Sequence, residues 1–185
     1  ETELIIEQLI KIYKGKSIKI LDIGVGSGCI LISLLSELVY SKGIGIDISK
    51  KALLIAEKNV KKHKVYKRIK LINKSFEDMY KREFDLIVSN PPYVKTSDIK
   101  NLDEDIKNYE PLIALDGGND GLDVIRKVIY KTKYILKING LFALEIGNEQ
   151  HKKVSKILKK NNFKVEKNIK DYNENTRCII SKLLK

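Results

Sequence analysis

Short apolar runs alternate with segments of helical periodicity along almost the whole chain, and no other feature of the sequence limits its fold as strongly. In the helical segments apolar residues recur at spacings of three and four, as at Leu31, Leu34 and Leu35. The runs predicted as strands are residues 18–23, 43–48, 69–72, 84–89 and 141–146, with shorter ones around 163–165 and 178–180. This alternation predicts an α/β fold, in which helices cover both faces of a mostly parallel sheet. At 185 residues the chain is expected to form one domain.

The first predicted strand runs into a glycine-rich loop, and a helix follows directly. The loop reads Gly24-Val25-Gly26-Ser27-Gly28. Glycines let a backbone approach a ligand closely, and the N-terminus of the following helix favours negative charge. The spacing departs from the dinucleotide fingerprint Gly-x-Gly-x-x-Gly, because Cys29 stands where its third glycine would be. The loop therefore predicts a cofactor site. On the loop alone, a site that binds an ordinary nucleotide is still an alternative.

A second unusual turn follows the fourth predicted strand, where Ser89 leads into Asn90-Pro91-Pro92-Tyr93. Neither proline has an N–H, so pairing in the sheet must end there, and each restricts the residue before it to extended or turn conformations. The turn offers an amide side chain, carbonyls without ladder partners and an aromatic ring, but no strong acid, base or nucleophile. Because ligands bind at this edge of open α/β sheets, the turn is suited to a substrate that must be positioned rather than deprotonated.

Together with Asp22 before it, the glycine loop resembles the first motif of S-adenosylmethionine-dependent methyltransferases with a Rossmann-like sheet. The resemblance implies that residues 24–28 pass the methionine part of S-adenosylmethionine. It also implies that Asp47, which ends the second predicted strand, accepts hydrogen bonds from the ribose hydroxyls. Phe76, in the turn after the third strand, would cover the adenine ring. A phenylalanine that only plugs the end of a strand is an almost equal alternative.

The turn at residues 90–93 matches the Asn-Pro-Pro-Tyr motif of methyltransferases that modify planar amide or amino nitrogens. An amide nitrogen is a poor nucleophile, because its lone pair is delocalised into the carbonyl. The side-chain oxygen of Asn90 and the carbonyl of Pro91 can accept its two N–H bonds and so direct the lone pair at the methyl group. Pro92 and Tyr93 would complete the catalytic turn, with Tyr93 walling the slot, and Asn90 would also contact the cofactor. As an alternative, such a turn can simply end a strand.

Further stretches narrow the resemblance to the protein-(glutamine-N5) methyltransferases that modify peptide-chain release factors. These stretches are Glu1-Thr2-Glu3, Tyr109–Leu122 with Arg126, Leu144–Gly147 with Gln150, and Asp171 with Arg177. The resemblance implies the Rossmann-like class I fold, with a seven-stranded sheet whose last strand is antiparallel. It implies S-adenosylmethionine as the cofactor and the glutamine of a Gly-Gly-Gln loop as the substrate. Glu110 is expected to shape the substrate entrance, and a purely structural turn is an equal alternative there.

Residues 1–185 are thus interpreted as a catalytic domain without the small N-terminal helical domain of that family, and Phe76 stands where a tryptophan is common. We expect a release factor as the protein partner, no membrane or direct nucleic-acid substrate, and a monomer in the cytoplasm or an organelle matrix. A ribosomal-protein glutamine methyltransferase is a close alternative. An adenine-N6 nucleic-acid methyltransferase shares the four-residue turn but usually needs a further region to extrude a base. A non-catalytic cofactor-binding protein would not need both Asp47 and Asn90.

The net charge of +12 comes almost entirely from lysine. We interpret it as a solvated surface, with attraction to an RNA-rich partner such as a ribosome still open. Cys29 and Cys178 form neither a disulfide framework nor a metal spacing, which favours a reducing compartment. Because the only histidines are His63 and His151, we expect no metal site.

Overall fold

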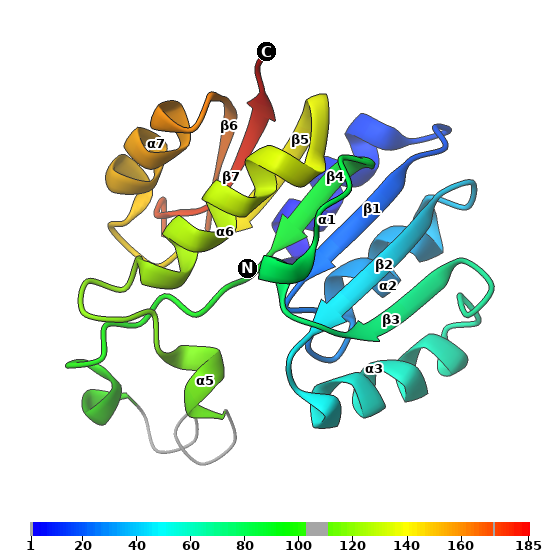
Figure 1. Ribbon diagram of the computed structural model, residues 1–185, viewed down its shortest axis with the longest axis horizontal. Helices are drawn as coiled ribbons and strands as arrows, with labels where there is room; N and C mark the ends of the chain where they lie inside the picture. Colours follow the sequence, from blue (N-terminus) through cyan, green and yellow to red (C-terminus); the bar gives the residue numbers. More distant parts are fainter. Residues whose placement is uncertain (1, 103–110, 172) are drawn as a thin grey trace.

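The computed structural model describes residues 2–102, 111–171 and 173–185, which form a seven-stranded sheet between two layers of helices (Figure 1). The strand order is β3-β2-β1-β4-β5-β7-β6. The strands are β1 (Lys19–Ile23), β2 (Lys42–Asp47), β3 (Ile69–Asn73), β4 (Phe84–Ser89), β5 (Leu136–Glu145), β6 (Phe163–Lys170) and β7 (Thr176–Leu183).

The first five strands are mutually parallel where they pair, whereas β7 runs antiparallel to both β5 and β6. This confirms the expected class I methyltransferase sheet with an antiparallel last strand. Strands β2 and β3 are added on one side of β1, and β4 and β5 on the other, so the strand order reverses between β1 and β4. These two strands are parallel neighbours, although two strands separate them in sequence. The carboxyl ends of these two strands therefore mark the position where such sheets bind ligands.

Helices α1 (Thr2–Tyr13), α2 (Cys29–Glu37) and α3 (Lys50–Lys62) cover one face of the sheet. Helices α6 (Asp123–Ile135) and α7 (His151–Lys160) cover the other face (Figure 1). Successive side chains of a strand point to opposite faces, so Ile20 joins the first core and Leu21 the second. Both side chains are fully buried, which explains why successive residues of the strand are apolar here.

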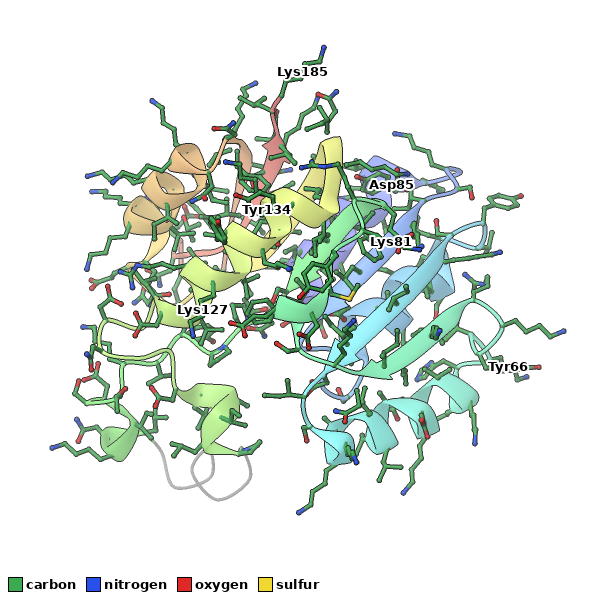
Figure 2. The ribbon with its side chains drawn as sticks, viewed as in Figure 1. Tyr66, Lys81, Asp85, Lys127, Tyr134 and Lys185 are labelled. Atoms are coloured by element: carbon green, nitrogen blue, oxygen red, sulfur yellow. The ribbon has the colours of Figure 1, made fainter. Side chains whose placement is uncertain are left out.

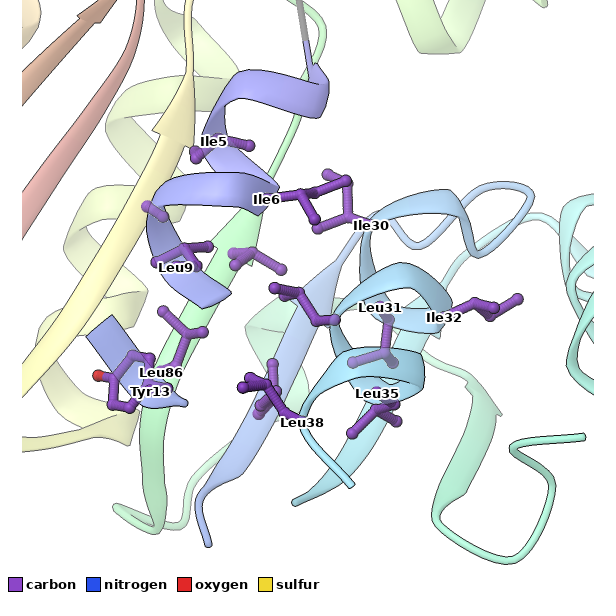
Figure 3. Close-up of a cluster of buried hydrophobic side chains, with 14 of the residues drawn as sticks. Ile5, Ile6, Leu9, Tyr13, Ile30, Leu31, Ile32, Leu35, Leu38 and Leu86 are labelled. Carbon is purple, nitrogen blue, oxygen red and sulfur yellow. The ribbon is translucent and has the colours of Figure 1, made fainter. Parts of the chain in front are cut away.

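The core under α1 and α2 is made of aliphatic side chains that approach one another from both helices and from the sheet (Figure 3). Ile6 of α1 points toward Ile30 of α2, and Leu86 of β4 lies beside Tyr13 (Figure 3). Gly15 ends α1 with a φ of 76°, as its place after the periodic segment predicts. The Ser49 side chain caps α3 by accepting a hydrogen bond of 3.2 Å from the backbone N–H of Ala52.

The structure differs from the predicted elements in its second half. Strand β5 begins at Leu136, five residues before the start of the strand predicted at residues 141–146. The added residues interrupt the apolar pattern, and one of them, Asn139, has a φ of 65°. Strand β6 is longer than the strand predicted around residues 163–165. Most of its side chains are polar and exposed at the sheet edge, so the apolar pattern does not reveal its full length. The aperiodic segment after Tyr93 contains the short helices η2 (Ile99–Asn101) and α5 (Leu112–Leu115), and the turn after β3 forms η1 (Phe76–Asp78).

The lysines lie mainly on the outside of the molecule, and Figure 2 shows Lys185 and Tyr66 pointing away from the ribbon. Cys29 and Cys178 are both free thiols, the first exposed and the second buried. Within the ranges described above, no helix has the length and apolar character needed to cross a membrane. The same ranges contain no cluster of three or more potential metal ligands.

Candidate active site

The residues predicted from sequence to bind a cofactor and a substrate meet at the carboxyl edge of the sheet. The register pairs Ile23 of β1 with Ile46 of β2 on one side and with Ser89 of β4 on the other. Gly24, Asp47 and Asn90 therefore begin the loops that leave three neighbouring strands. Glu110 lies outside the described residues, as do Glu1 and Tyr109 of the quoted stretches.

The glycine loop is held against β2 and α3 through its backbone. The N–H groups of Gly24 and Val25 both donate to the carbonyl of Ile46, at 2.9 and 3.0 Å. The Asn59 side chain of α3 donates to the carbonyl of Ser27 at 2.9 Å. Gly28 has a φ of 86°, and a Cβ atom there would lie 2.7 Å from Ile32 Cδ1. The loop thus passes close over the start of α2 in a conformation that favours glycine.

Asp47 connects the glycine loop to the start of α3. Its Oδ2 atom accepts a hydrogen bond from the backbone N–H of Gly26 at 2.9 Å, and its Oδ1 atom accepts from that of Ser49 at 2.8 Å. The carboxylate is only partly buried. Because each carboxylate oxygen can accept two hydrogen bonds, both oxygens keep capacity for a ligand. Asp47 therefore supports the loop and can still bind the hydroxyls assigned to it by sequence.

Asp22 is the last but one residue of β1, two positions before the glycine loop, and is the most deeply buried acid of the site, with 1% of its surface exposed. Its Oδ2 atom has no hydrogen-bond partner in the described part of the chain. Burial raises the pKa of Asp22 from 3.8 to about 7, the backbone N–H of Leu31 opposes this rise, and the negative charge of Asp47 adds to it. Asp22 belongs to the motif seen in the sequence, but the motif by itself predicts no role for its side chain. Its burial depends on packing that the motif alone does not reveal.

The raised pKa of Asp22 predicts that the ligand-free protein loses stability as the pH rises. Between pH 3.8 and about 7 the folded protein holds a proton on Asp22 that the unfolded chain releases, so the free energy of unfolding falls across this window. The free energy of unfolding should fall by roughly 4 kcal/mol over this window, at about 1.4 kcal/mol for each pKa unit. Asp22→Asn should abolish this fall. Urea unfolding of both proteins at pH 4 to 8 tests the prediction, and parallel pH profiles would contradict it.

Two acceptors of the Asn90–Tyr93 turn, on Asn90 and Pro91, are free among the described residues. Asn90 is exposed, Pro91 is buried, and Pro92 and Tyr93 are partly buried. Before the turn, the Ser89 hydroxyl donates to the carbonyl of Ile23 at 2.9 Å and fastens it to β1. Within the described residues no hydrogen bond engages the Asn90 side chain or the Pro91 carbonyl. The turn therefore presents two unoccupied acceptors beside the glycine loop.

The chain after the turn folds back on the segment that precedes α6. Val94 forms a parallel bridge with Asp116, its N–H donates to the carbonyl of Leu115 at 3.0 Å, and its own carbonyl accepts from Gly117 at 2.8 Å. Asp116 Oδ1 accepts from the Thr96 hydroxyl at 2.7 Å and from the N–H of Gly118 at 2.9 Å. The Thr96 and Gly118 hydrogen bonds lower the pKa of Asp116. In its described part, the segment after the turn is thus held by hydrogen bonds to the residues that precede α6.

The other residues quoted from sequence are placed as follows. Arg126 pairs with Asp120 and, at 2.8 Å, with Asp123, which ties the start of α6 to the preceding loop. Arg177 and Asp171 pair at 3.2 Å beside the β6–β7 connection. Phe76 is partly buried in η1 and packs against the second core, so its stacking on a ligand stays a prediction.

The chain also matches known proteins. The family model described as the methyltransferase small domain matches residues 1–107. A release factor glutamine methyltransferase of Agrobacterium fabrum is 36% identical over 97% of this chain, which spans 64% of that protein. A bifunctional methyltransferase of Rickettsia felis is 41% identical over 88% of this chain, with 31% of its own length matched.

The fold is shared with solved structures of low sequence identity. A ribosomal protein L11 methylase from Lactobacillus delbrueckii subsp. bulgaricus superposes with a TM-score of 0.74 at 19% identity, and the match covers 100% of this chain and 79% of the methylase. A likeness at this identity concerns the fold, whereas the match to the family model covers more than half of the sequence. The chain therefore belongs to the methyltransferase small domain family and has the class I methyltransferase fold.

Proposed function

We propose that the site binds S-adenosylmethionine. The observation that carries the proposal is the pair of carboxylates, Asp22 and Asp47, beside the glycine loop. The unpartnered buried oxygen of Asp22 suits a cationic ligand, because an opposite charge would offset its desolvation. The phosphates of a nucleotide would instead meet two acidic side chains. Residues 24–28 and Asp47 would hold the cofactor, with Phe76 and Asn90 as further contacts.

We further propose that residues 1–185 are the catalytic domain of a methyltransferase for the glutamine of a release-factor Gly-Gly-Gln loop. Support comes from the identity to release factor glutamine methyltransferases, of which the chain spans about half to two thirds in several cases. The acceptor-only chemistry of the Asn90–Tyr93 turn agrees with an amide substrate. An enzyme with this substrate would work where translation occurs, in the cytoplasm or an organelle matrix.

In the proposed reaction, the turn holds the glutamine amide by its two N–H bonds. Asn90 Oδ1 and the carbonyl of Pro91 accept them, and Tyr93 confines the flat group. S-adenosylmethionine, when bound, supplies an electrophilic methyl group. The residues of the turn raise the rate by aligning the amide nitrogen rather than by removing a proton beforehand. The proton that the nitrogen loses on methylation passes to solvent, so no general base is required.

Incubation with methyl-labelled S-adenosylmethionine and a purified release factor tests the proposal. Label should enter the release factor and be absent from its Gln→Ala variant in the Gly-Gly-Gln loop. Ribosomal proteins and DNA serve as parallel substrates. Equal labelling of both release-factor forms would refute the assigned position, and label on ribosomal protein or DNA alone would refute the assigned substrate.

A further inference from the structure

The side chain of Gln150 joins three separate segments around the Asn90–Tyr93 turn. Its Nε2 group donates to the carbonyl of Tyr93 at 3.0 Å and to the carbonyl of Gly121 at 3.1 Å. Its Oε1 atom accepts from the N–H of Gly147 at 2.9 Å. Both amide hydrogens and the amide oxygen are therefore used on backbone groups. Gln150 is itself fixed, because its carbonyl accepts the N–H of Val154 at 2.9 Å at the start of α7.

Glycines surround the same piece of backbone so closely that it has little freedom to move. A Cβ atom on Gly121 would lie 2.5 Å from the Tyr93 carbonyl oxygen, and one on Gly117 would lie 2.9 Å from Tyr93 Cα. A Cβ atom on Gly147 would lie 3.0 Å from Tyr93 Cδ2, so this glycine faces the tyrosine ring. Tyr93 is therefore the residue that both the glycine backbone and the side-chain amide of Gln150 contact. This is the end of the turn that the two prolines cannot fix by themselves.

We propose that Gln150 is a positioning residue that sets the geometry of the Asn90–Tyr93 turn, and therefore of the acceptors that hold the substrate amide. The hydroxyl of Ser89 anchors the start of the turn on β1, and Gln150 anchors its end on the α7 side. The role in catalysis rests on the proposed function of the turn. Only an uncharged amide of this length supplies one acceptor and two donors in one plane. A glutamate carboxylate of the same shape would place an oxygen that cannot donate against the carbonyl oxygens of Tyr93 and Gly121.

Gln150→Glu tests this role with almost no change in side-chain volume. We expect kcat for release-factor methylation to fall at least about tenfold, because small misplacements of a reacting group cost this much or more. The dissociation constant of S-adenosylmethionine should stay within about twofold, since the side-chain hydrogen bonds of Gln150 go to Tyr93, Gly121 and Gly147 and not to residues 24–28 or Asp47. Hydrogen–deuterium exchange at the N–H groups of Val94 and Gly117 should become faster, because their backbone hydrogen bonds lie directly after Tyr93. We call the hydrogen bonds of Gln150 that hold Tyr93 and Gly121 the clamp.

Val154→Ala is the matched control, since it removes buried side-chain packing from the same helix and keeps the backbone N–H that donates to the Gln150 carbonyl. It should lower the unfolding midpoint and leave kcat and the exchange of Val94 unchanged. An equal loss of kcat in Val154→Ala would overturn the proposal by pointing to general destabilisation. Wild-type kcat and wild-type exchange in Gln150→Glu would overturn it as well. The exchange measurement needs no substrate, so it decides about the clamp even if the wild-type protein fails to methylate release factors.

Discussion

Asn90→Ala is expected to lower kcat for methyl transfer by at least about 100-fold and to leave the affinity for S-adenosylmethionine largely intact. In the proposed reaction the substitution removes one of the two acceptors for the substrate amide, and positioned polar groups of this kind contribute on the order of 100-fold to 1,000-fold in rate. The side chain has no hydrogen-bond partner among the described residues, so its removal should not disturb the fold.

Single-turnover kinetics with saturating cofactor and calorimetric titration of the cofactor separate the two effects of Asn90→Ala. Asn168→Ala is the control, because it makes the same change on the exposed edge strand β6, away from the carboxyl ends of β1 and β4. Turnover in Asn90→Ala within a few-fold of wild type would remove the alignment argument.

Asp47→Ala should weaken the binding of S-adenosylmethionine by about 100-fold or more. Two hydrogen bonds to a charged acceptor are lost, each contributing about 1.5 kcal/mol or more. The loop also loses support, because the N–H groups of Gly26 and Ser49 both donate to this carboxylate. Calorimetry measures the affinity, with Glu57→Ala as an acidic control on the exposed side of α3. An unchanged dissociation constant would refute the ribose assignment.

The sheet and the location of the site could be predicted from the sequence because both depend on local patterns. Strands that are buried on both faces carry apolar residues on both, so the runs at Ile20–Leu21 and Leu86–Val88 stand out, and the residues after these strands must meet at one edge. The glycine loop and the double proline are local departures from regular structure, which a single sequence displays directly. Gly24, Asp47 and Asn90 lie at or directly after the carboxyl ends of neighbouring strands, as this reasoning expects, while their roles in binding stay predictions.

Other features could not be predicted because they arise from contacts between distant segments. The pKa of Asp22 is raised by burial in the folded core and, to a smaller extent, by the charge of Asp47 on the neighbouring strand. Gln150 bonds to a carbonyl 57 residues earlier in the chain, and no spacing rule connects these positions. The polar residues of β6 hide its strand character, because an edge strand with one solvated face has little apolar pattern to show.

The free acceptors of the Asn90–Tyr93 turn also bear on selectivity between isosteric side chains. Glutamine and glutamate have the same outline and differ only in whether the terminal group carries hydrogens. A glutamate at this position would set lone pairs against the oxygens of Asn90 and Pro91, and such mismatched sites reject the wrong analogue strongly. On the proposed function, a release factor whose glutamine has undergone deamidation would thus not be methylated.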